Sequence, residues 1–237
     1  MWLNHWHRLV VRSIFGITSA AVLVSCVSLS PATPTLEPAL KDQSLLTDTP
    51  CAAPCWYGLE LGKTTKAEAL ATAQTLSFIN STVFPEIAEY YGYWDGSKDV
   101  NVPGTRVLLR CKQQDQTCSS LLFVNDTLKD ILLAPNYELT LGEVVAHLGE
   151  PDYVRFFRTS IHGHNCAVSL FWKQWGIRVT YLNVRTTQIR CDAVQKDKRL
   201  DKNLLVQRIA YMLPENFAIA SAPEPGQDFP WAGFIEP

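Results

Sequence analysis

Two segments of the chain alternate apolar and polar positions in the same way and predict two similar β-hairpins. In Cys118–Leu133, two apolar strands flank the polar pair Asn125-Asp126. In Cys166–Tyr181, two apolar strands flank a turn at positions 174–176. A period of two that is interrupted by turn residues is typical of an antiparallel hairpin. Because the second segment repeats the pattern of the first, the sequence predicts a tandem repeat.

Each predicted hairpin is preceded by a start signal for a helix. Thr65 and Glu68 have the spacing of a capping box, and so do Thr140 and Glu143. In a capping box, both side chains accept hydrogen bonds from backbone N–H groups that lack partners at a helix start. The second helix is expected to end at Gly149, because glycine is a favoured residue just after a helix.

Further strands are predicted at Thr105–Cys111 and Tyr153–Arg158. A final apolar element, Asn203–Leu213, favours a strand and is compatible with a helix as well. A short helix is predicted to begin at Pro85, whose fixed φ suits a first helical position, and to end at Gly92. The pattern thus places a helix and three strands in each half of the folded region.

The elements together predict an α+β protein of two tandem helix-plus-three-strand repeats, with helices packed on antiparallel sheet. The first repeat is assigned to residues 51–135 and the second to residues 136–213. The first repeat is longer because it carries an insertion that is rich in aromatic residues. That cluster favours core and strand packing over a platform for sugars or aromatic ligands. Its members are Tyr90, Tyr91, Tyr93 and Trp94.

The N-terminal segment has the pattern of an export signal. Arg8 and Arg12 precede the apolar stretch Ser13–Val24, and no acidic residue lies before it. This stretch is shorter than the roughly twenty residues of a membrane-spanning helix. We therefore predict a signal peptide over residues 1–25. Residues 26–50 contain four prolines among Ser, Thr and Ala, and they predict an extended tether.

The C-terminal segment, residues 214–237, is rich in Pro and Ala and predicts an irregular strap. Phe229, Trp231 and Phe234 are expected to dock on the folded part. An exposed tail that binds a partner is the alternative, because exposed aromatic residues at a terminus otherwise favour aggregation.

The 237 residues carry a formal net charge of -2 and seven cysteines. This charge excludes the basic footprint of a nucleic-acid-binding protein. One cysteine, Cys26, has a separate role described below. The other six fit three disulfides in an oxidising compartment. The predicted pairs are Cys51 with Cys55, Cys111 with Cys118, and Cys166 with Cys191.

One stretch offers metal-ligand chemistry. His162, His164 and Cys166 alternate along the chain and could face one zinc or copper ion, with Asp152 or Cys191 as a fourth ligand. The disulfide count favours Cys166 as a disulfide cysteine, so we expect no metal and no cofactor. No nucleophile, general-base or phosphate-loop motif is present in the sequence, and no catalytic residue is predicted.

The four residues Leu23-Val24-Ser25-Cys26 resemble a bacterial lipobox. The resemblance implies cleavage before Cys26, a diacylglyceryl thioether on its sulfur, and acylation of the new amino group. Val27 follows, so the acidic residue that retains some lipoproteins at the inner membrane is absent. Two or three acyl chains give stable anchoring, whereas one chain binds only marginally.

Three short segments mark the helix starts and the end of the second helix: Gly62-x-Thr64-x-x-Ala67-Glu68-Ala69, Thr140-Leu141-Gly142-Glu143-Val144-Val145 and Leu148-Gly149-Glu150-Pro151-Asp152. They resemble the helical start of the BamE/SmpA-like lipoproteins, and the tandem arrangement is similar to the β-lactamase-inhibitor-protein fold. The overall layout is also similar to that of lipoproteins of filamentous Chloroflexi-type bacteria. The resemblance implies helices on an antiparallel sheet and a role in scaffolding or protein binding.

Taken together, these features predict a lipid-anchored, extracytoplasmic module that binds or scaffolds other proteins without catalysis. Its expected location is the cell membrane or outer envelope, and its expected partners are the membrane, through the lipid anchor, and another envelope protein. The alternative is an extracytoplasmic metal-binding protein or enzyme that uses His162 and His164.

Overall fold

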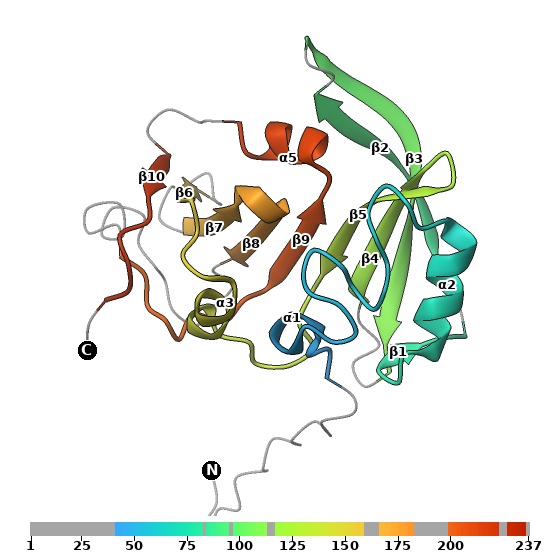
Figure 1. Ribbon diagram of the computed structural model, residues 1–237, viewed down its shortest axis with the longest axis horizontal. Coiled ribbons are helices and arrows are strands. Elements are labelled where there is room, and N and C mark those ends of the chain that lie inside the picture. The colour runs from blue at the N-terminus through green and yellow to red at the C-terminus, as the bar shows by residue number, and fades with distance from the viewer. Residues whose placement is uncertain are drawn as a thin grey trace, which may run out of the picture. The chain divides into compact units, whose positions relative to one another are not determined.

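A single antiparallel sheet forms the body of the protein (Figure 1). The computed structural model describes residues 41–82, 84–94, 97–112, 117–158, 166–182, 199–222 and 227–235. All of these residues belong to one compact unit, Leu36–Pro237. The strands are β1 (Ile79–Asn80), β2 (Glu86–Trp94), β3 (Asp99–Cys111), β4 (Thr117–Val124), β5 (Thr127–Leu133), β6 (Tyr153–Arg158), β7 (Cys166–Trp172), β8 (Ile177–Leu182), β9 (Arg208–Met212) and β10 (Asp228–Pro230).

The helices of the described residues are few and short. They are α1 (Ser44–Thr47), α2 (Lys66–Thr75), α3 (Leu141–Leu148) and α5 (Pro214–Ala220), with a 3₁₀ turn at Lys173–Trp175. Both predicted capping boxes are confirmed. The Thr65 hydroxyl accepts from the Glu68 N–H, and the Glu68 carboxylate accepts from the Thr65 N–H. Thr140 and Glu143 repeat this exchange at the start of α3.

The fold class predicted from the sequence is wrong. In the described residues, ten strands form one sheet in the order β1-β3-β4-β5-β9-β8-β7-β6-β10, with β2 also paired to β3. The two halves are therefore not tandem helix-plus-three-strand repeats with helices packed on antiparallel sheet. The reason lies in β9, which pairs with β5 on one side and with β8 on the other. It satisfies the backbone groups of both edges and joins the halves into one sheet.

The two hairpins themselves are confirmed. β4 and β5 meet at Asn125 and Asp126, whose φ values of 48° and 62° match the left-handed conformation that a two-residue hairpin turn requires. β7 and β8 are joined through the 3₁₀ turn and Gly176, which has φ of 63° and ψ of 31°. Local turn chemistry thus sets both hairpins independently of the sheet around them.

The helix predicted from Pro85 to Gly92 is also wrong, because this segment is the strand β2. All nine residues of β2 pair with β3, which is longer than the predicted Thr105–Cys111 and begins at Asp99. Pro85 donates no hydrogen bond but accepts one from the N–H of Leu108. Strand pairing therefore outweighs the helix-start signal of the proline.

The sheet has two faces that differ in composition. The main core lies on one face. The helices α2 and α3 contribute Ala69, Ala73, Val144 and Leu148 to this core. The opposite face, called the outer face below, carries two smaller apolar clusters. One surrounds Phe171, Ala210, Met212 and Phe217, and the other surrounds Tyr91, Leu122 and Val124. Between these clusters the outer face is polar and charged.

The folded part begins earlier than the predicted tether allows. Leu45 of α1 is only 3% exposed and belongs to the main core. The Asp42 carboxylate accepts a hydrogen bond of 2.9 Å from the indole of Trp56 and one of 2.7 Å from the Ser44 hydroxyl. At the other end, the segment predicted as an irregular strap contains α5 and β10. β10 pairs with β6 at the edge of the sheet.

Candidate functional site

A cavity of about 580 Å³ lies between the outer face and α5. Four strands supply one row of polar residues in register, and the next row on the same face is mostly apolar. The polar row is Arg155, Ser169, Thr180 and Arg208, from β6, β7, β8 and β9. The second row is Tyr153, Phe171, Arg178, Ala210 and Leu132, from β6, β7, β8, β9 and β5. Because alternate residues of a strand share a face, the strand order brings three arginines to one cavity.

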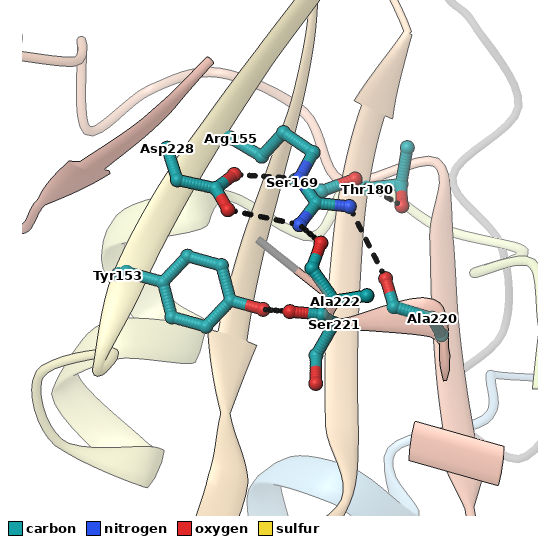
Figure 2. Close-up of polar contacts among 8 residues, drawn as sticks. All are labelled: Tyr153, Arg155, Ser169, Thr180, Ala220, Ser221, Ala222 and Asp228. Carbon is teal, nitrogen blue, oxygen red and sulfur yellow. Dashed lines mark hydrogen bonds and ion pairs between the residues drawn. The ribbon is translucent and has the colours of Figure 1, made fainter. Parts of the chain in front are cut away.

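Arg155 is fully engaged with the segment that covers the cavity (Figure 2). Its Nε donates to Asp228 Oδ1 over 2.6 Å, and its Nη2 donates to Asp228 Oδ2 over 3.0 Å. The same guanidinium donates to the carbonyls of Ala220 and Ala222, at 3.3 and 2.5 Å. The nearby Tyr153 hydroxyl donates to the Ser221 carbonyl over 3.1 Å. These bonds fasten the end of α5 and β10 to β6, so Arg155 has a structural role.

Arg178 is placed differently, because its Nε is buried and has no hydrogen-bond partner among the described residues. Burial lowers the pKa of Arg178, and the positive charges of Arg155 and Arg208 act in the same direction. The charge of Asp130 opposes this shift. Arginine nevertheless stays protonated in proteins, so the site holds a partly buried cation whose Nε donor is unsatisfied.

Two hydroxyls and one exposed arginine complete the polar row. Ser169 and Thr180 are 3% and 9% exposed, and their hydroxyl oxygens lie 3.1 Å apart (Figure 2). Only one of the two can donate to the other, so the second proton remains available to a ligand. Arg208 is exposed at the rim of the cavity.

A second charged network lies on the outer face next to the cavity. Arg106 donates to Asp130 Oδ1 over 2.8 Å, to Glu89 Oε1 over 3.1 Å and to the Ser120 hydroxyl over 3.1 Å. Burial raises the pKa of Asp130, although the charge of Arg106 opposes the shift. Asp130 is thus already bound to Arg106, as Asp228 is bound to Arg155.

Several residues predicted as sites lie outside the described part of the chain. These are Cys26, His162, His164 and Cys191. Cys166 begins β7, but its side chain also falls outside the description. The predicted metal site and the third predicted disulfide therefore stay predictions. Within the described ranges, no group of three or more His, Cys, Asp or Glu residues is suited to hold a metal ion.

Two of the predicted cysteine pairs are disulfides in the structure. Cys51 and Cys55 have Cα atoms 5.7 Å apart, and Cys111 and Cys118 have Cα atoms 5.6 Å apart. Cys111 ends β3 and Cys118 lies near the start of β4, so the antiparallel pairing of these strands brings them together.

The predicted aromatic groups divide between core and surface. Tyr91 is 3% exposed and stacks on Tyr93 with ring centroids 5.9 Å apart, whereas Tyr90 is 72% exposed. The tail residues Phe229, Trp231 and Phe234 are partly buried against the main core, as expected for docking. Among the helices that the structure describes, none has the length and apolar character to span a membrane.

The arginine cavity was not predicted from the sequence. Arg155 and Arg178 lie within mostly apolar strands and Arg208 begins one, and these positions are a local signal of a polar outer face. Comparisons of the chain with protein-family models, with curated proteins and with solved structures each found no match. The resemblances described above therefore stay predictions, and function has to be inferred from the chemistry of the chain itself.

Proposed function

We propose that this chain is an extracytoplasmic binding module whose arginine-lined cavity binds an anionic group. The observation that carries the proposal is the buried Nε of Arg178, which has no partner among the described residues and belongs to a residue lining the cavity. A buried donor without an acceptor costs about 1–3 kcal/mol, and more when the group is charged. An anion in the cavity would be attracted by the Arg178 guanidinium, whose charge is only partly compensated by the protein, and a neutral ligand would lack this attraction.

The charges around Arg178 favour the same ligand. Arg208 and Arg155 repel Arg178, and the adjoining carboxylates Asp228 and Asp130 are engaged with Arg155 and Arg106. An anion between Arg178 and Arg208 would offset this repulsion. Arginine is suited to the task because its planar fork matches carboxylate and phosphate geometry.

Binding is a better-supported role than catalysis. The described lining residues include no histidine, cysteine or carboxylate that could act as a general base or a metal ligand. The two hydroxyls of the lining, on Ser169 and Thr180, bond to each other rather than to a base. Donors that converge on one apolar-walled cavity, without a proton acceptor beside them, are typical of a ligand site.

The test uses the full chain and thermal unfolding in a panel of anions at constant ionic strength. The panel runs from chloride through acetate and inorganic phosphate to octanoate. Anions that bind the folded state raise the unfolding midpoint by mass action. Arg178→Met keeps the length of the side chain and removes the charge, and Arg110→Met, at an exposed strand arginine, is the matched control.

We expect Arg178→Met to weaken anion binding by about tenfold or more, because a bond to a charged group contributes about 1.5 kcal/mol or more. Arg110→Met should leave binding unchanged. If no anion of the panel shifts the midpoint in a way that depends on Arg178, the proposed function is wrong.

The proposed location rests on the N-terminal sequence, with support from the two disulfides, which favour an oxidising compartment. We propose that Cys26 carries the lipid anchor and that the module faces the extracytoplasmic side of the cell membrane or outer envelope. Mass spectrometry of membrane fractions should find a diacylated N-terminal Cys26. An unmodified Cys26 in a soluble secreted protein would contradict the anchor.

A second proposal is a protein partner in the envelope, and β2 favours it. β2 pairs with β3, and no other described strand pairs with it. Outside this pairing, Asn216 of α5 donates to the Gly92 carbonyl of β2. Ile87 and Tyr90 of β2 are 50% and 72% exposed. A strand edge with exposed apolar side chains can accept a strand from another protein. Chemical cross-linking in membranes should join β2 to a partner, and Ile87→Lys with Tyr90→Lys should abolish that product.

A further inference from the structure

The cavity has two ends of opposite character. At one end lies the polar row, which includes Arg208, and at the other lie Leu132, Ala210 and Ile219. Arg178 stands at the junction, because its register neighbours are Phe171 on β7 and Ala210 on β9. The helix α5 closes the apolar end, where Phe217 packs on Phe171 with ring centroids 6.0 Å apart. A ligand that fills this cavity therefore meets donors at one end and hydrocarbon at the other.

The size of the cavity separates two kinds of ligand. The cavity measures about 580 Å³, which lies within the ~300–1,000 Å³ typical of sites for organic ligands. A bare oxyanion is only a few times larger than a water molecule, whose share of the liquid is ~30 Å³. A bare anion at the polar row would thus leave the apolar end in contact with water. A ligand that also carries an apolar chain could bury that chain there.

The charge count limits the polar part of the ligand. Arg155 is neutralised by Asp228 over 2.6 Å, and Asp130 is held by Arg106 over 2.8 Å. Arg106 is shared with a second carboxylate, Glu89, so Arg106, Asp130 and Glu89 together carry a net charge of -1. With Arg178 and with Arg208, which is exposed to solvent at the rim, one positive charge is left uncompensated. One anionic group between these two arginines matches the donors that the cavity offers. A second anionic group would fall among the apolar residues, where an unpaired charge is costly.

We propose that the ligand of this cavity is an amphipathic anion, in which one carboxylate or phosphate group is joined to an apolar chain. The anionic group lies between Arg178 and Arg208, with the free hydroxyl proton of the Ser169–Thr180 pair within the same polar row. The chain lies against Leu132, Ala210 and the inner side of α5. This inference rests on the proposed function and adds the chemical class of the ligand to it.

The experiment measures binding to the full chain in nanodiscs of zwitterionic phosphatidylcholine. The probes are octanoate and octyl phosphate, the bare groups acetate and inorganic phosphate, and the neutral analogue octanol. Burial of two CH₂ groups already gives about tenfold in affinity. We therefore expect each octyl anion to bind at least tenfold more tightly than its bare group, and octanoate to bind at least tenfold more tightly than octanol. The tighter of the two octyl anions identifies carboxylate or phosphate as the preferred group.

Two variants separate the ends of the cavity. The Ala220 side chain packs against the apolar cluster around Phe171 and Phe217, although its backbone carbonyl bonds to Arg155. Ala220→Leu therefore enlarges a side chain at the apolar end, and it should weaken octanoate binding about tenfold while acetate binding stays unchanged. Ala71→Leu, at an exposed position of α2, is the matched control and should change neither octanoate binding nor acetate binding. Retained acetate binding shows that Ala220→Leu is folded. Arg178→Met should weaken both probes.

The outcomes distinguish this inference from the function on which it rests. If acetate or phosphate binds as tightly as its octyl form, with dependence on Arg178, the amphipathic ligand is wrong and the anion site stands. If octanol binds as tightly as octanoate, the amphipathic anion is likewise wrong. If no probe binds in a way that depends on Arg178, both the inference and the proposed function are wrong.

Discussion

The guanidinium of Arg155 on β6 holds the carboxylate of Asp228 on β10 in a two-pronged ion pair, with Nε 2.6 Å from Oδ1 and Nη2 3.0 Å from Oδ2. The side chains are 9% and 19% exposed. The pair fastens the edge strand β10 to the sheet, and through the carbonyls of Ala220 and Ala222 it also fastens the end of α5. One arginine thus holds the wall of the cavity in place.

Loss of the carboxylate at this point should destabilise the fold. Asp228→Asn leaves the buried Arg155 charge unpaired, and the expected loss in the free energy of unfolding is about 3 kcal/mol. Urea denaturation measures this loss. Asp99→Asn, at an exposed position, is the control and should stay within about 0.5 kcal/mol of the wild type. Equal effects of the two substitutions would show that the ion pair does not stabilise the fold.

The turn between β7 and β8 should not tolerate a side chain at Gly176. A Cβ atom there would lie 2.2 Å from the Met212 carbonyl oxygen, while the Met212 N–H donates to the Gly176 carbonyl over 3.0 Å. Gly58 also has a positive φ, but a Cβ there would have no atom within 4 Å. We expect Gly176→Ala to cost about 1–3 kcal/mol more than Gly58→Ala, because only Gly176→Ala adds overpacking to backbone strain. Denaturation of both variants measures the difference, and equal losses would contradict the close approach.

Stability should fall at alkaline pH, in part through Tyr153. Burial raises the pKa of Tyr153 to about 12, whereas an unfolded tyrosine has a pKa of about 10. Between these values the unfolded state loses a proton that the folded state keeps, so stability falls as the pH rises. Tyr153→Phe lacks this dependence. The stability gap between the wild type and Tyr153→Phe, measured in urea, should therefore narrow from about pH 10 upward. A constant gap would be inconsistent with the raised pKa.

The disulfide between β3 and β4 should contribute to stability. Cys111 and Cys118 are separated by seven positions, and closing a short loop contributes about 2 kcal/mol through the unfolded state. Replacing both cysteines with alanine should lower the free energy of unfolding by this amount when denaturation is measured without reductant. With reductant present, the variant and the wild type should have the same free energy of unfolding. Peptide mapping without reductant identifies the bonds directly and also tests the predicted pair Cys166–Cys191. Free thiols at positions 111 and 118 would contradict the bond.

The elements that were predicted correctly from the sequence are those determined by interactions between residues close together in the chain. The capping boxes at Thr65 and Thr140 and the turn at Asn125-Asp126 depend on residues within a few positions of each other, so they can be found without the rest of the chain. The segment after Pro85 was misassigned because its local signals favour a helix. Its actual partner is β3, and the pairing decides its structure.

The fold and the arginine cavity depend instead on strand order. Arg155, Arg178 and Arg208 lie far apart in the sequence, and each is locally only a polar residue in or at the start of a mostly apolar strand. They face one cavity only because β9 pairs with β8, so that Arg208 joins the row of Thr180. No period or motif in one segment encodes which strand will be its neighbour. The predicted repeat also favoured two separate halves, which led away from a shared central strand.

The central position of β9 also affects how the protein is made. Synthesis runs from β5, which ends at Leu133, through β8, which ends at Leu182, to β9, which begins at Arg208. Whether the chain folds during synthesis or after export, the edge of β5 has no neighbour until β9 has emerged. During that interval two open strand edges can pair with other newly made chains. A chain truncated before Arg208 would keep both edges open permanently, so aggregation or degradation, rather than a smaller folded protein, is its expected fate.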